Sequence, residues 1–505
     1  MNIRDAKIEI MNALKVYFRK DSEGRYLCPA VRQRPILLMG PPGIGKTAIM
    51  EQAAREAGVG LVAYTMTHHT RQSAIGLPHI ETRIYQGRET VVTEYTLSEI
   101  VASVYDCMER TGVREGILFL DEINCVSETL VPVMLQFLQN KTFGNHRIPD
   151  GWLIAAAGNP PEFNRSVREF DIVTLDRVRR IEIQPDLAVW LDYARERQVH
   201  GAVISYLSIR DGHFCQVRQT PDGAAFVTPR GWEDLSVLIA GYEALGLPFS
   251  QSQAGQFLQD EEIARAFAGY YRLYQKFGEA YGIPEILDGS LEDFSGKIAM
   301  AQSGEMDERF SVVNLVLDRL NGLFSQYEQA DREVSALHQA LGSLKLFLQG
   351  KMDFSVFEEF VQGRREALEV KCAAGLLEEE ERRLEAWVLR RLEDFSATLR
   401  AEFIRDVDQG FERVRELFEE DAARRRKIAE NVGAQLNRAF AFLEECFGDG
   451  QEMILFVSAL ARLDRAMDFV AVHGCEPFLK YGKRLIFQER EAELREACRE
   501  VLGTD

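Results

Sequence analysis

The stretch that decides the fold reads Ile36-Leu37-Leu38-Met39-Gly40-Pro41-Pro42-Gly43-Ile44-Gly45-Lys46-Thr47. Its four leading apolar residues predict a buried strand, and the eight that follow match the phosphate-loop pattern G-x-x-x-x-G-K-[ST]. Glycines let backbone N–H groups turn toward phosphate oxygens, and the helical segment that follows directs the positive end of its dipole at the same place. The stretch therefore predicts a strand–loop–helix unit that binds the phosphates of a nucleotide.

Two side chains of this loop carry chemistry. Lys46 is expected to reach the β- and γ-phosphates of ATP, and the hydroxyl of Thr47 is expected to bind Mg²⁺. The predicted cofactor-binding residues of the loop are Gly40, Pro41, Pro42, Gly43, Ile44, Gly45, Lys46, Thr47 and Ala48.

Three more short apolar runs follow, at residues 61–64, 117–120 and 153–157, and helical stretches separate them. Almost wholly apolar strands that alternate with helices are typical of a parallel sheet buried on both faces. We therefore expect an α/β fold, with a parallel sheet and helices on both of its faces.

Two acidic residues, Asp121 and Glu122, come directly after the third of these strands. A carboxylate at the carboxyl end of a buried strand next to a phosphate loop can hold Mg²⁺, so Asp121 is a predicted metal ligand. Glu122 is then placed to act on a water that attacks the γ-phosphate. A kinase acting on a metabolite would not need this second acid, so the pair favours hydrolysis.

The chain has 505 residues and a net charge of −19, and residues 301–505 hold 41 acidic against 29 basic residues. A net negative surface repels phosphate backbones, so a broad nucleic-acid-binding face is disfavoured. Eight scattered cysteines without metal spacing are typical of a reduced, cytoplasmic compartment. No apolar run reaches the about 18 residues of a membrane span, and residues 1–18 do not form a signal peptide.

The length suggests about three domains. We predict a nucleotide-binding α/β domain at 1–185, a small and mainly helical lid at 186–300, and an acidic all-α domain at 301–505. Two short strands are expected around a turn at Pro221 and Asp222. An apolar ladder from Leu384 to Phe418 predicts one long amphipathic helix, which Gly410 would bend or break.

Taken together, the motifs resemble the AAA+ ATPases and, within them, the MoxR-like branch. The resemblance covers roughly residues 1–240. It is carried by the phosphate loop, Leu118-Phe119-Leu120-Asp121-Glu122-Ile123-Asn124, Ala157-Gly158-Asn159-Pro160, Leu175-Asp176-Arg177 and Thr228-Pro229-Arg230.

The resemblance implies roles for three further residues. Asn159 matches the sensor-1 position, whose amide contacts the γ-phosphate or the attacking water. Arg177 matches the arginine finger that acts on a neighbouring subunit's nucleotide, although Arg179 and Arg180 are close enough to be alternatives. A salt bridge to Asp176 or Asp171 is the structural alternative for Arg177. Arg230 matches sensor 2 on the lid.

The MoxR-like branch also carries two insertions near a ring pore. The first corresponds here to a hairpin at 81–94, with Tyr85 and Arg88 near its tip, and the second to a hairpin around Phe143-Gly144-Asn145-His146. Solvent-exposed hairpins without a partner are an equally simple interpretation. A metal site at His68, His69 and His79 is disfavoured because no carboxylate or cysteine is spaced to complete it. The basic run 424–427 is interpreted as a solvated helix face.

The resemblance implies a homo-oligomeric, hexameric ring that hydrolyses ATP with Mg²⁺ and acts as a chaperone-like remodeller of a protein partner. In MoxR-like systems this partner often has a von Willebrand factor A domain. Two alternatives stay open. One is a nucleic-acid-associated AAA+ motor, which the charge disfavours, and the other is a slow, nucleotide-gated scaffold that works through its acidic helical region.

Overall fold

The computed structural model describes residues 1–68, 74–126, 130–143, 146–161, 163, 170, 172–220, 223–291, 294–351, 356–373, 377 and 379–483. The chain divides into two compact units. Unit 1 comprises Met1–Trp190, Asp211–Leu235 and Gly255–Ala264, and unit 2 comprises Leu191–Arg210, Ser236–Ala254 and Arg265–Asp505. The segment 186–300, which was predicted as a lid, contributes residues to both units.

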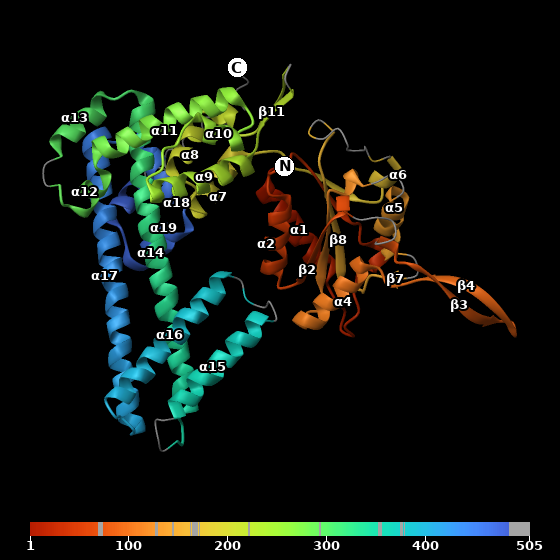
Figure 1. The fold of residues 1–505 in the computed structure, drawn as a ribbon. Coiled ribbons are helices and arrows are strands. Elements are labelled where there is room, and N and C mark those ends of the chain that lie inside the picture. The colour runs from red at the N-terminus through yellow and green to blue at the C-terminus, as the bar shows by residue number, and fades with distance from the viewer. Residues whose placement is uncertain are drawn as a thin grey trace. The chain divides into compact units, whose positions relative to one another are not determined.

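Unit 1 is built from a central sheet, its covering helices and three short hairpins (Figure 1). Its helices are α1 (Ile3–Tyr17), α2 (Lys46–Ala57), α4 (Glu99–Thr111), α5 (Val131–Asn140) and α6 (Ile172–Leu175). Its strands are β1 (Ile36–Met39), β2 (Gly60–Thr65), β3 (Pro78–Tyr85), β4 (Arg88–Tyr95), β5 (Gly116–Asp121), β6 (Thr142–Phe143), β7 (His146–Arg147), β8 (Trp152–Gly158), β9 (Arg179–Glu182), β10 (Gln216–Thr220) and β11 (Gly223–Val227).

The central sheet is parallel and has the strand order β2-β5-β8-β1-β9. Its first four strands confirm the four predicted from apolar runs. The fifth, β9, was not predicted because its sequence Arg-Arg-Ile-Glu buries only Ile181. As an edge strand it has one neighbour, so it does not need the continuous apolar run that identifies an inner strand.

Both faces of this sheet are covered, as the α/β prediction requires. Alternate residues of the strands point to opposite faces. On one face Ile36, Leu38, Phe119 and Ala155 pack against α1 and α2. On the other face Leu37, Leu118, Leu120 and Ile154 pack against α4 and α5. The sheet is therefore the middle layer of an α/β/α sandwich, and its loops lie at the strand ends.

The register of the sheet determines which loops meet. Met39 of β1 pairs with Gly158 of β8, and β8 also pairs with β5 in parallel. The residues that follow β1, β5 and β8 therefore leave the sheet at the same edge. These residues are the phosphate loop, the pair after Leu120, and Asn159.

The predicted hairpins are present where the structure describes them. β3 and β4 pair over their full length, with Tyr85 opposite Arg88 at the tip. β6 and β7 form a shorter pair whose connecting residues, Gly144 and Asn145, lie outside the described residues. β10 pairs with β11, and the predicted turn at Pro221 and Asp222 also lies outside them.

Unit 2 is all-α where it is described. Its helices are α8 (Gly201–Ile209), α12 (Ile283–Asp288), α13 (Ser295–Ser303), α14 (Met306–Phe347), α15 (Val356–Ala373), α16 (Glu379–Ala401), α17 (Val407–Phe447), α18 (Gln451–Ala461) and α19 (Asp464–His473). Four further helices have residues in both units: α7 (Leu187–Glu196), α9 (Pro229–Leu245), α10 (Gln251–Phe257) and α11 (Glu261–Tyr281). No helix among the described residues is long and apolar enough to cross a membrane.

The two longest helices, α14 and α17, pack against each other along unit 2 (Figure 1). One apolar cluster joins one half of this pair to α12, α13, α18 and α19, and a second joins the other half to α15 and α16. The prediction of one helix from Leu384 to Phe418 is wrong, because α16 ends at Ala401 and α17 begins at Val407. Phe403 adopts a left-handed φ of 56° and Asp406 caps α17, whereas Gly410 lies inside that helix.

Candidate functional site

The phosphate loop has a backbone that only its glycines allow easily. Gly43 and Gly45 have φ values of 75° and 93°, and Gly45 is the N-cap of α2. The first intrahelical bond of α2 is donated by Ile49 to the carbonyl of Gly45, at 3.0 Å. The N–H groups of the first helical turn have no acceptor within the helix, so they can bind an anion.

Lys46 lies in this loop as a buried cation whose hydrogen bonds all go to neutral oxygens. Its Nζ donates to the carbonyls of Gly40 and Pro41, at 2.9 and 2.8 Å, and to Oδ1 of Asn159 at 2.9 Å. Burial lowers the pKa of Lys46 to about 8, although the nearby Asp121 carboxylate opposes this shift. A phosphate would supply the negative charge that its partners lack, so the group fits a nucleotide phosphate.

Thr47 and Asp121 meet beside this lysine. The Thr47 hydroxyl donates to Oδ2 of Asp121 at 2.8 Å, and Oδ1 of Asp121 accepts the N–H of Glu122 at 2.9 Å. A hydroxyl and a carboxylate are the hard oxygen ligands that Mg²⁺ takes in nucleotide sites. The pair predicted to hold the metal is therefore brought together and has donor atoms of the right kind.

Glu122 has a left-handed backbone, with φ 54° and ψ 36°. This conformation is uncommon outside glycine and costs of order 1–3 kcal/mol, so the surrounding structure must impose it. This conformation ends β5 at Asp121 and leads the chain into the short 3₁₀ turn Ile123–Cys125. Glu122 thus leaves the sheet at the edge where the phosphate loop and Asn159 also lie.

Asn124 is a residue of this site to which the sequence analysis gave no role. It is buried, its Nδ2 donates to the carbonyl of Asn159 at 2.8 Å, and its Oδ1 accepts the N–H of Asn159 at 3.3 Å. The sequence signal available was a polar residue in an otherwise apolar stretch after Glu122. Only the pairing of β5 with β8 shows what this residue contacts.

The segment that holds Arg230 packs against the phosphate loop. A Cβ at Gly43 would lie 3.1 Å from Oγ1 of Thr228 and 3.1 Å from Cβ of Arg230. Thr228 also accepts the N–H of Gly231 at 3.2 Å, which fixes the start of α9. The charge of Arg230 contributes to the lowered pKa of Lys46, so the two cations share one electrostatic environment.

Three arginines were predicted as candidates for an arginine finger, and their partners in the structure differ. Arg179 pairs with Glu9, and Arg180 pairs with Glu182 at 2.6 Å. Arg177 is exposed, and none of the ion pairs among the described residues includes it. Asp171, one of its two alternative partners, lies outside the described residues.

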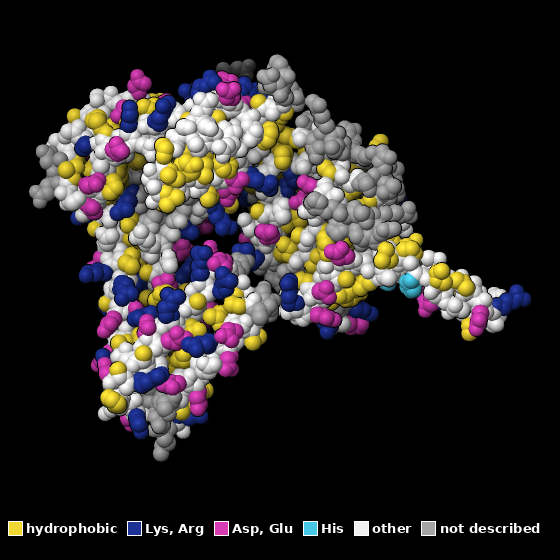
Figure 2. Space-filling model, viewed as in Figure 1, with side chains coloured by type: hydrophobic (Ala, Val, Ile, Leu, Met, Phe, Trp, Pro, Cys, Tyr) yellow, Lys and Arg dark blue, Asp and Glu magenta, His cyan; other side chains and the backbone are white. Residues whose placement is uncertain are grey.

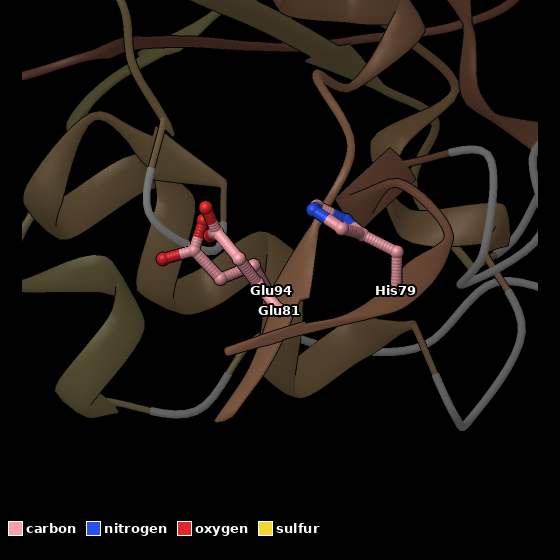
Figure 3. Close-up of side chains that lie close together, drawn as sticks. All are labelled: His79, Glu81 and Glu94. Atoms are coloured by element: carbon pink, nitrogen blue, oxygen red, sulfur yellow. The ribbon is translucent and has the colours of Figure 1, made fainter. Parts of the chain in front are cut away.

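The β3–β4 hairpin carries a second cluster of charged groups. Ligand atoms of His79, Glu81 and Glu94 all lie within 4.8 Å of one another, and Figure 3 shows the His79 ring turned toward two adjacent carboxylates. The expectation that no carboxylate is spaced to complete a site with His68, His69 and His79 is wrong for His79, because Glu94 lies opposite it across the hairpin. His69 lies outside the described residues. Arg83 contacts both glutamates, so these carboxylates already have a cationic partner.

Comparisons with known proteins agree with this geometry. The family described as "AAA domain (dynein-related subfamily)" matches residues 35–182. Among solved structures, the chain is similar to a "putative ATPase" from Cytophaga hutchinsonii, at 18% identity over 38% of this chain and 55% of that one, with a TM-score of 0.24. It is also similar to two RuvB variants from Thermotoga maritima.

The RuvB matches have 14% and 12% identity. They cover 42% and 52% of this chain and 52% and 73% of those chains, with TM-scores of 0.24 and 0.30. The match to the Cytophaga protein spans about half of that protein's length. These similarities are too loose to support an argument about function, and no curated protein matches the sequence. The family match covers the sheet and the phosphate loop together. Residues 35–182 are therefore an AAA domain, which is the nucleotide-binding domain of AAA+ ATPases.

Proposed function

We propose that this protein is a Mg²⁺-dependent, MoxR-like AAA+ ATPase that assembles into a ring and remodels or activates a protein partner. A protein with a von Willebrand factor A domain is one candidate partner. The observation that carries the proposal is the cluster at one sheet edge, in which Lys46 donates to Asn159 and Thr47 donates to Asp121, whose carboxylate also accepts the N–H of Glu122.

In this proposal each residue of the cluster has one task. Lys46 and the first turn of α2 bind the phosphates of ATP, and Thr47 with Asp121 holds Mg²⁺, which neutralises phosphate charge. Glu122 orients the attacking water and accepts its proton. Asn159 directs its amide at the γ-phosphate or at that water.

Two arginines support the proposed ring. Arg177 is exposed and outside the ion pairs of the described residues, so its guanidinium is available to a neighbouring subunit's nucleotide. Arg230, which packs against the phosphate loop, is proposed as the sensor-2 residue that reports whether nucleotide is bound. Because the finger acts across an interface, hydrolysis depends on assembly.

The partner-binding element in this proposal is the β3–β4 hairpin. Ile80, Ile84 and Val91 lie on one face of it and are 77%, 71% and 67% exposed. Figure 2 shows apolar side chains among charged ones along this hairpin. Large apolar side chains gathered on an exposed ribbon favour contact with another protein.

The test uses Glu122→Gln, with Glu51→Gln on the exposed side of α2 as its matched control. Glu122→Gln should bind ATP but lose hydrolysis, and it should be found in an assembly larger than a monomer when ATP is present. A partner captured by Glu122→Gln in ATP should be lost from a double variant that also carries Ile84→Ser. An unchanged hydrolysis rate in Glu122→Gln, or a monomer at every nucleotide condition, would overturn the proposal.

A further inference from the structure

Asn124 ties the end of β5 to the end of β8 through the backbone N–H and C=O of a single residue, Asn159. Its side chain is 4% exposed, and both ends of its amide are used on Asn159. Nδ2 donates to the Asn159 carbonyl and Oδ1 accepts the Asn159 N–H. A buried amide is costly unless it is hydrogen-bonded, and here the bonds fix one residue from both sides.

The residue held in this way has its own side chain directed elsewhere. Oδ1 of Asn159 accepts the Nζ of Lys46 at 2.9 Å. Asn159 is therefore held by its backbone to the turn after Glu122 and by its side chain to the phosphate loop. Its position depends on Asn124, two residues along the chain from Glu122.

Gly158 shows how closely Asn124 packs on this strand end. A Cβ at Gly158 would lie 2.7, 2.9 and 3.1 Å from Oδ1, Cγ and Nδ2 of Asn124, and these are its three nearest neighbours. Gly158 does not have a positive φ, so an alanine there would be opposed by this side chain rather than by its own backbone. The strand thus ends in glycine where the Asn124 amide lies against it.

We propose that Asn124 is a positioning residue for ATP hydrolysis, which acts by holding Asn159 in register with Glu122. The inference rests on the proposed roles of those two residues. If the two hydrogen bonds between Asn124 and Asn159 are lost, Asn159 can move relative to Glu122 while the phosphate loop keeps its shape. A displacement of about 1 Å at a reacting centre can lower the rate about 100-fold. We therefore expect a larger change in kcat than in the Kd for nucleotide.

The first test is the isosteric change Asn124→Asp, which replaces the donor Nδ2 by an oxygen that faces the Asn159 carbonyl. We expect kcat to fall about 10- to 100-fold, with the Kd for a fluorescent ATP analogue changed less than about threefold. Asn124→Ala should lower kcat in the same way. A role in packing alone would leave the rate of Asn124→Asp near that of the wild type, and this result would overturn the inference.

The second test is a cycle with Gly158→Ala. This single variant should lose about as much kcat as Asn124→Ala, because the new Cβ displaces the Asn124 amide. In the double variant Asn124→Ala and Gly158→Ala the three opposing atoms are gone, so its kcat should be no lower than that of Asn124→Ala. Losses that multiply in the double variant would show that Gly158 and Asn124 act separately and would overturn the inference.

Glu122→Gln, measured in parallel, keeps this inference separate from the proposed function. If Glu122→Gln is inactive while Asn124→Asp and Asn124→Ala hydrolyse ATP at the wild-type rate, only the role of Asn124 is wrong. If Glu122→Gln hydrolyses ATP normally, the proposed function itself is wrong. Thermal unfolding of each variant checks that a lost rate does not reflect a lost fold.

Discussion

Lys46 at the sheet edge of unit 1 and Asp421 among the helices of unit 2 are both buried charges, but they have different kinds of hydrogen-bond partner. In unit 1, the ammonium of Lys46 is surrounded by two carbonyls and one amide oxygen. In unit 2, Asp421 of α17 is 3% exposed and accepts Nη2 and Nε of Arg391 of α16, at 2.8 and 3.2 Å. Glu452 is also buried, and Arg309 lies 2.7 Å from it.

The difference shows which buried charges have their counter-charge within the same chain. A buried charge is costly without a counter-charge, and an ion pair offsets much of that cost. Asp421 and Glu452 each pair with a guanidinium on a neighbouring helix, so these two ion pairs join helices. Lys46 accepts a lowered pKa instead, which is reasonable for a group that meets its counter-charge on a ligand.

The largest effect is expected at Arg177, an exposed charge outside the ion pairs of the described residues. Arg177→Ala should lower ATP hydrolysis about 10³- to 10⁵-fold, because an arginine finger stabilises charge on the transferring phosphoryl group. Nucleotide binding should be retained, and Arg180→Ala, which removes a guanidinium paired with Glu182, should have little effect. Hydrolysis rates and nucleotide titrations make the comparison.

Mixing variants tests whether this arginine acts across subunits. Arg177→Ala subunits keep Glu122, and Glu122→Gln subunits keep the finger, so a mixture of the two inactive proteins should regain hydrolysis. A normal rate for Arg177→Ala alone, or an inactive mixture of subunits that do assemble, would refute a finger that acts in trans.

Lys46→Ala should separate binding from stability. Losing a charge-assisted contact to phosphate should weaken ATP binding by about 2–5 kcal/mol, or roughly 30- to 5,000-fold in Kd. The free energy of unfolding without nucleotide should not fall by the same amount, because the variant also removes an unpaired buried charge. Isothermal titration and urea denaturation measure the two quantities. A protein that unfolds readily would show that Lys46 is structural.

Asp421→Ala should have the opposite pattern to Lys46→Ala. It should lower the free energy of unfolding and change the rate of ATP hydrolysis much less. We expect a loss of about 2–4 kcal/mol from the unfolding of unit 2, somewhat below that of a fully buried pair because Arg391 keeps Asp394 as a partner. Glu412→Ala, in an exposed pair with Arg415, is the control and should cost about 0.5 kcal/mol or less. Equal losses in the two variants would contradict the comparison.

The sequence predicted the parts of this protein that depend on neighbouring residues along the chain. Four of the five strands of the central sheet, the phosphate loop and the acids after β5 were predicted because each is a local pattern. The prediction also brought Lys46, Thr47 and Asp121 to one place, since parallel strands end at the same edge. The structure adds the hydrogen bonds that Lys46 donates to Asn159 and that Thr47 donates to Asp121.

What the sequence did not show depends on cross-strand contacts and on helix ends. The link from Asn124 to Asn159 spans 35 positions, and His79 meets Glu94 only because a hairpin pairs them. Strand β9 has the sequence Arg-Arg-Ile-Glu and buries only Ile181, so no apolar run identifies it. The break at Phe403 lies within an apolar ladder that continues through it, so spacing alone favours one helix.

Lys141 provides the finest test of the comparison, because it is a second buried lysine with neutral partners in unit 1. Its Nζ donates to Oε1 of Gln33 at 2.8 Å and to the carbonyl of Trp152 at 3.3 Å. Burial lowers its pKa from 10.5 to about 8, as at Lys46. Lys141 lies at the C-cap of α5 rather than on the phosphate loop, so no ligand phosphate is expected to pair with its charge.

The sign of its effect follows from the two pKa values. Below pH 8 the folded and unfolded states both hold the proton, and the folded state carries the cost of a buried charge. Between pH 8 and 10.5 the folded state releases the proton first, so the unfolded state binds more protons and stability rises with pH. From pH 7 to 9.5 the expected gain is about 2 kcal/mol.

Lys141→Met isolates this contribution, because methionine has a similar length and meets the same left-handed backbone, φ 56°. The stability of the wild type relative to this variant should increase by about 2 kcal/mol from pH 7 to 9.5 in urea denaturation. Lys46 titrates in both proteins and cancels in the difference. If the difference does not change with pH, Lys141 keeps an ordinary pKa. Buried lysines with neutral partners would then not be alike, and the lowered pKa of Lys46 would need a cause beyond burial.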